Sequence, residues 1–81
     1  MGVSFTVQVL GSEGEPAEGI EVEAHFPSWP AGTVTSEERT DSDGQASFET
    51  VGDHDEVTLY VEGEKHGPYD LSDGDSFTVN L

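Results

Sequence analysis

Apolar and polar residues alternate along several short segments of this chain. Residues 3–10 place an apolar side chain at every second position, and 20–26 and 57–62 repeat the pattern. This period of two, in β-branched and aromatic residues, is typical of a strand with one buried face. In the last segment, 76–81, we expect Phe77, Val79 and Leu81 to face the core.

Clusters of Gly, Pro, Asp and Ser separate the segments, and no segment has the sustained 3.6-residue apolar period of a helix. Residues 33–40 are expected to form a polar edge strand, 51–55 a loop and 63–67 a turn. Short strands about ten residues apart predict an all-β, seven-stranded antiparallel Ig-like β-sandwich, with residues 1–81 as a single domain. The predicted strands are 3–10, 20–26, 33–40, 45–50, 57–62, a short one from 69, and 76–81.

The chain is strongly acidic, with 18 Asp and Glu against two basic residues and a formal net charge of −16. This balance argues against binding to nucleic-acid phosphates or to an anionic membrane surface, which both need Lys and Arg. Cysteine is absent, which excludes disulfides and thiolate nucleophiles. No apolar run reaches membrane-spanning length and no secretory signal peptide is visible.

Three interpretations could account for the acidity of the chain. Disorder conflicts with the alternating pattern. Mimicry of DNA by an acidic inhibitor would favour one concentrated acidic face, whereas the acids are spread along the sequence. The third is adaptation to molar salt, in which repulsion among surface carboxylates is screened. The near-absence of Lys resembles the composition of proteins from extreme halophiles and their viruses. We therefore expect the protein to be located in a virion or in the cytoplasm of a halophilic host, or to be an excised module of a surface protein.

Two segments carry a family resemblance: 14–22, with its Gly, Pro and Val spacing, and 40–48, which reads Thr-Asp-Ser-Asp-Gly-Gln-Ala-Ser-Phe. With the hydrophobic strand at 57–61, they resemble carboxypeptidase regulatory-like, transthyretin-like and collagen-adhesin B-type domains. The resemblance implies a β-sandwich that serves as a spacer, stalk or structural piece. The adhesins' isopeptide-forming Lys in the first strand is missing, because position 8 is Gln and Lys65 falls in the predicted turn. Self-crosslinking is therefore not expected.

Candidate chemistry is sparse. Asp41 and Asp43 begin like a calcium loop, but position 12 of that loop would be Gly52 instead of Glu, so a hairpin turn is the favoured interpretation. Asp73 and Asp75 are interpreted in the same way. The three histidines, His25, His54 and His66, have no metal-ligand spacing and are expected at the surface. We therefore expect no enzyme activity, cofactor or metal.

Aromatic residues mark the expected contact surface. Trp29 between Pro27 and Pro30 is rigid and amphipathic, so it could anchor an interface or fold back onto the sandwich. Tyr60, Tyr69 and Arg39 are expected to extend such a patch.

These observations favour a non-catalytic structural or interaction module adapted to high salt. The expected role is a small subunit of an assembly, such as a virion capsid decoration, turret or tail component, or a cell-surface accessory. Its partners would be other protein subunits, including copies of itself, with no nucleic acid and no membrane insertion. The alternatives are a carbohydrate-binding module that uses exposed aromatics, and an acidic DNA mimic.

Overall fold

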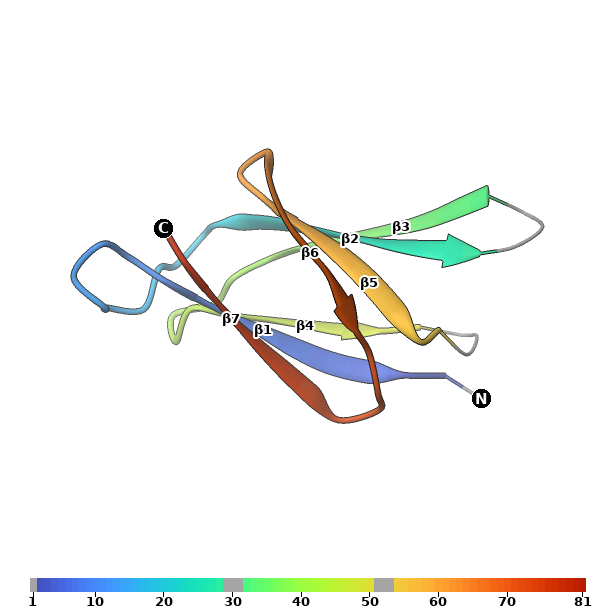
Figure 1. Ribbon diagram of the computed structural model, residues 1–81. Helices are drawn as coiled ribbons and strands as arrows, with labels where there is room; N and C mark the ends of the chain where they lie inside the picture. The colour runs from blue at the N-terminus through green and yellow to red at the C-terminus, as the bar shows by residue number, and fades with distance from the viewer. Residues whose placement is uncertain (1, 29–31, 51–53) are drawn as a thin grey trace.

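A computed structural model describes residues 2–28, 32–50 and 54–81 of the chain. Its strands form two sheets that pack face to face, which confirms the predicted β-sandwich (Figure 1). The strands are β1 (Ser4–Leu10), β2 (Glu21–Ser28), β3 (Gly32–Arg39), β4 (Gln45–Glu49), β5 (Glu56–Val61), β6 (Glu64–Asp70) and β7 (Asp75–Asn80). Within the described part of the chain no helix is long and apolar enough to cross a membrane.

One sheet has three strands in the order β4-β1-β7, and the other has four in the order β3-β2-β5-β6. Most neighbours are antiparallel, but β1 and β7 run parallel, with Phe5 opposite Asp75 and Leu10 opposite Asn80. The expectation of a purely antiparallel sandwich is wrong at this pair. Strands β2 to β6 lie between β1 and β7 in the sequence. No hairpin therefore connects β1 to β7, and nothing forces the two strands to run antiparallel.

The core lies between the two sheets and is built almost entirely from the predicted apolar positions. Phe5 is its centre: its ring stacks on Phe48 at 5.0 Å and meets Phe26 and Phe77 edge-on at 5.9 Å. Burying each such ring contributes about 1.5–3 kcal/mol. The buried apolar residues are Val3, Phe5, Val7, Val9, Val22, Ala24, Phe26, Ala46, Phe48, Val57, Leu59, Val61, Leu71 and Val79.

Two expectations about the C-terminal third are wrong. Residues 64–70 form strand β6, where a turn was expected over 63–67. The turn is shorter, because Glu62 (φ 51°) and Gly63 (φ 83°) both adopt the positive φ of a two-residue hairpin loop. Leu81, expected in the core, is 49% exposed because the sheet ends at Asn80.

Candidate interaction surface

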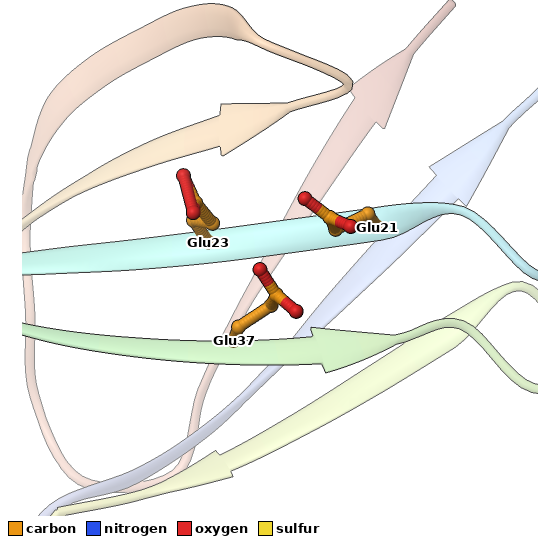
Figure 2. A group of neighbouring side chains, drawn as sticks. All are labelled: Glu21, Glu23 and Glu37. Carbon is orange, nitrogen blue, oxygen red and sulfur yellow. The ribbon is translucent and has the colours of Figure 1, made fainter.

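The outer face of the four-stranded sheet is acidic. Glu21 and Glu23 extend from β2 and Glu37 from β3, and carboxylate oxygens of all three lie within 4.8 Å of one another. Figure 2 shows Glu37 reaching from β3 toward β2, where its carboxyl group lies between the other two. The cause is the strand register, since Glu37 stands directly opposite Glu23. We call Glu21, Glu23 and Glu37 the acidic triad.

The acidic triad is electrostatically unfavourable in dilute buffer. The Glu21 carboxylate, followed by desolvation and the Glu23 charge, raises the pKa of Glu37 above its usual value. Arg39 offsets part of this charge: its Nη2 lies 3.5 Å from Glu21 Oε2, and its Nη1 donates a hydrogen bond to the Gly19 carbonyl. Three carboxylates at this spacing offer the oxygen ligands of a hard cation, although exposed acidic groups also gather without one.

The rest of this face is also charged. Five acids and both basic residues of the chain occupy its outward strand positions, since Lys65 lies opposite Tyr60 and Asp70 opposite Glu56. The outward residues with described side chains are Glu21, Glu23, His25, Thr35, Glu37, Arg39, Glu56, Thr58, Tyr60, Lys65 and Asp70.

The outer face of the three-stranded sheet is very different. Glu49 is the one charged residue at an outward position of β4, β1 and β7, three strands that the structure describes in full. Hydroxyl and amide groups dominate, and the Gln45 side-chain amide donates to Gln8 Oε1 at 3.1 Å. We call this surface the uncharged face. Its residues are Ser4, Thr6, Gln8, Leu10, Gln45, Ser47, Ser76, Thr78 and Asn80, with Glu49 as the one charged member.

A shallow open hollow of about 310 Å³ lies at one end of the uncharged face. The hydroxyl-bearing residues Ser4, Thr6 and Ser47 line it, and Glu49 and Asp75 also contribute to its wall. Phe5 and Phe48 also line the hollow, so it offers a partner both hydrogen-bonding groups and some apolar surface.

The expected aromatic patch does not assemble as a unit. Tyr60 lies on the acidic outer face, with its ring centroid 4.5 Å from that of His25. Tyr69 lies on the core side of the same sheet and stacks on Phe77 at 5.1 Å. The two tyrosines therefore cannot form one stacking platform, and Arg39 belongs to the acidic triad's surroundings. The backbone of Pro27 pairs with that of Thr33. Trp29 and Pro30, which were expected to belong to the patch, lie outside the described residues.

The aspartate turns have structural roles. Asp41 Oδ1 accepts hydrogen bonds from the Asp43 and Gln45 amides at 2.9 and 3.0 Å, which confirms a turn. The expected hairpin is wrong, because this turn connects β3 of one sheet to β4 of the other, and the two strands do not pair. In the next such turn, Asp73 Oδ1 accepts from the Ser4 amide at 2.8 Å and from its hydroxyl at 3.1 Å. These two bonds from Ser4 lower the pKa of Asp73.

All three histidines, His66 included, are half-buried and so more enclosed than expected. His25 is half-buried beside Tyr60, with Nε2 3.7 Å from Glu23 Oε2, and His54 packs against Phe26 at a ring distance of 4.8 Å. His25 lies on the outer face and Phe26 on the core side of the same strand, so the structure does not bring these two histidines together on one face.

The sequence contains a signal for the uneven distribution of charge between the two outer faces. Outward positions 4, 6, 8, 76, 78 and 80 are all uncharged, which is unusual in a chain of net charge −16. The pattern becomes visible only when β1 and β7 are known to be neighbours in one sheet.

Comparisons with known proteins support the fold alone. No protein-family model and no curated protein matches the sequence. A crystal structure of a 9R-lipoxygenase from Cyanothece PCC8801 is similar in fold, with a TM-score of 0.67 and 16% identity over 99% of this chain. This chain spans only 16% of the length of that lipoxygenase. At this identity the likeness carries no information about activity.

Proposed function

We propose that this domain is a non-catalytic interaction module adapted to molar salt, and that it serves as a small subunit of a larger protein assembly. The observation that carries the proposal is the contrast between the two outer faces. One bears the acidic triad and both basic residues, and the other has Glu49 as its single charged outward residue.

The acidic face suits a concentrated salt solution. At about 1 M salt the Debye length is near 3 Å, so carboxylates such as those of the acidic triad repel one another only weakly. In dilute buffer the same charges act over about 10 Å and oppose the compact state. This supports the hypersaline setting that the composition indicates.

The uncharged face suits contact with protein in the same setting. Ionic contacts across an interface are weakened by molar salt, whereas hydrogen bonds and close packing persist. Ser, Thr, Gln and Asn side chains at outward positions of three neighbouring strands offer such bonds without a charge to desolvate. Such a subunit would expose its acidic face to the salt solution and its uncharged face to neighbouring protein subunits. It could be a capsid decoration, a turret or tail component, or a cell-surface accessory.

Light scattering after size exclusion tests the proposal in 3 M and 0.15 M KCl. We expect a folded oligomer in 3 M KCl that dissociates or unfolds in 0.15 M KCl, where like charges repel. The melting temperature should be much higher in 3 M KCl than in 0.15 M KCl. A monomer at both salt concentrations, with an unchanged melting temperature, would contradict both parts of the proposal.

A further inference from the structure

Strand β7 has an open edge without the usual protection. It is the last strand of the order β4-β1-β7, so its far side pairs with no described strand. Open edges are normally protected by charged residues, by proline or by a covering segment. From Ser76 to Leu81 the sequence has no charged side chain and no proline.

The other edge strands are protected. Strand β3 ends in Glu37, Glu38 and Arg39, and β6 contains Glu64, Lys65, Pro68 and Asp70. Strand β4 lies beside β3 of the other sheet. The open edge of β7 is therefore the place where a second copy of this acidic chain can approach with the least charge repulsion.

The hydrogen bonds show which backbone groups are available. The Leu81 amide donates to the Leu10 carbonyl of β1 at 2.8 Å. Because the backbone direction alternates along a strand, residues 77, 79 and 81 direct their N–H and C=O groups toward β1. Those of Ser76, Thr78 and Asn80 face the open edge.

We propose that this edge pairs antiparallel with β7 of a second copy, about a two-fold axis at Thr78. The proposal rests on the proposed function and names one of its contacts. In this register Thr78 lies opposite its own copy, Ser76 opposite Asn80, and Phe77 opposite Val79. The pairs that exchange hydrogen bonds, 78 with 78 and 76 with 80, are those whose backbone groups face the edge.

The side chains fit the same register. Opposed residues point to one side of a sheet, so the hydroxyl and amide side chains of Ser76, Thr78 and Asn80 meet on the outer side, where such cross-strand pairs are favourable. The two uncharged faces then join into one continuous surface. On the core side, Leu81, which is 49% exposed, comes opposite Asp75 of the other copy, where it loses exposed area. The two Asp75 residues fall at opposite ends of the paired strands, so their carboxylates do not face each other.

Thr78→Pro tests this pairing, because proline removes an amide that faces the open edge and leaves the bonds to β1 in place. Thr78→Val is the matched control, since it keeps the amide and suits a strand. By light scattering in 3 M KCl we expect the wild type and Thr78→Val to have the same molar mass. Thr78→Pro should have half that mass, because its self-association should be at least tenfold weaker. Amide exchange at Thr78 should be slow in the wild type.

A folded state of Thr78→Pro is checked by its circular dichroism spectrum, and Asn80→Pro replaces it if it fails to fold. A wild-type oligomer that neither proline variant dissociates would overturn the edge pairing and leave the proposed function standing. A wild-type chain that is monomeric in 3 M KCl would overturn the edge pairing together with the proposed self-assembly.

Discussion

Glu37 illustrates how single acids on this molecule depend on salt and pH. Its pKa is raised, chiefly by the Glu21 carboxylate. A carboxyl group with a raised pKa in the folded state favours folding while it is protonated, and this contribution is lost as the pH rises through the folded pKa. At neutral pH and low salt the ionised Glu37 therefore opposes folding.

Replacing Glu37 by Gln should raise the melting temperature in 0.1 M KCl at pH 7, because it removes the charge that the acidic triad crowds. Glu49→Gln is the matched control, since it removes one carboxylate from the uncharged face. We expect a clearly smaller change for Glu49→Gln, and in 3 M KCl the two variants should differ little. The advantage of Glu37→Gln at low salt should also shrink as the pH falls and Glu37 becomes protonated. Equal effects of the two variants at low salt would show that the triad has no special repulsion.

Individual side chains were predictable where they follow the alternating pattern and less so elsewhere. The turn interpretation of Asp41 needed only local sequence, because an Asp side chain bonds to amides a few residues ahead. Thr40 is different: it is buried, and its hydroxyl accepts from the Ile20 amide at 2.8 Å and donates to the Ala17 carbonyl at 2.6 Å. That role depends on a long-range contact that no local pattern encodes.

Among the elements, the turn between β3 and β4 depends on Gly44. Its φ of +75° lies in the left-handed region, and a Cβ added there would come within 2.7 Å of the Val9 carbonyl oxygen and 2.9 Å of the Ala17 amide. The Gly44 carbonyl also accepts from the Val9 amide at 2.7 Å. These contacts hold the turn that precedes β4 against β1.

Gly44→Ala should destabilise the fold more than Gly74→Ala. Both positions have positive φ, which costs about 1 kcal/mol for an alanine, but a Cβ at Gly74 meets nothing within 4 Å. At Gly44 the backbone must also shift, which adds about 1–3 kcal/mol. Chemical denaturation in 3 M KCl measures the two free energies of unfolding. Similar losses for both variants would mean that the close approach at Gly44 is not a constraint.

Strands were predicted well where one face is buried and poorly where it is not. β1 and β5 alternate strictly and appear almost as expected. β6 is an edge strand with mostly exposed residues and a register shift against β5, so it lacks the alternation that marks a strand. The parallel pairing of β1 with β7 joins the two ends of the chain, and the local sequence contains no signal for it.

At the scale of the whole molecule, composition indicated a salt-adapted surface but not its arrangement. Along the sequence the acids are spread out, because the chain changes from one sheet to the other at β2, β4, β5 and β7. At the outward strand positions the fold separates them: five acids lie on the four-stranded sheet, and Glu49 is the one acid on the three-stranded sheet within the described strands. This sorting distinguishes a contact side from a solvent side.

The most direct test of that distinction is to place one lysine on each face and compare the masses in 3 M KCl. Thr6 and Thr58 are both half-buried threonines at outward positions of internal strands, on the uncharged and the acidic face respectively. Thr6→Lys would place a charge within the contact surface, where desolvation is costly even in molar salt. We predict that Thr58→Lys keeps the wild-type oligomeric mass by light scattering and that Thr6→Lys lowers it. A Thr6→Lys variant with the wild-type mass, or a Thr58→Lys variant that alone dissociates, would contradict the uncharged face as the contact side.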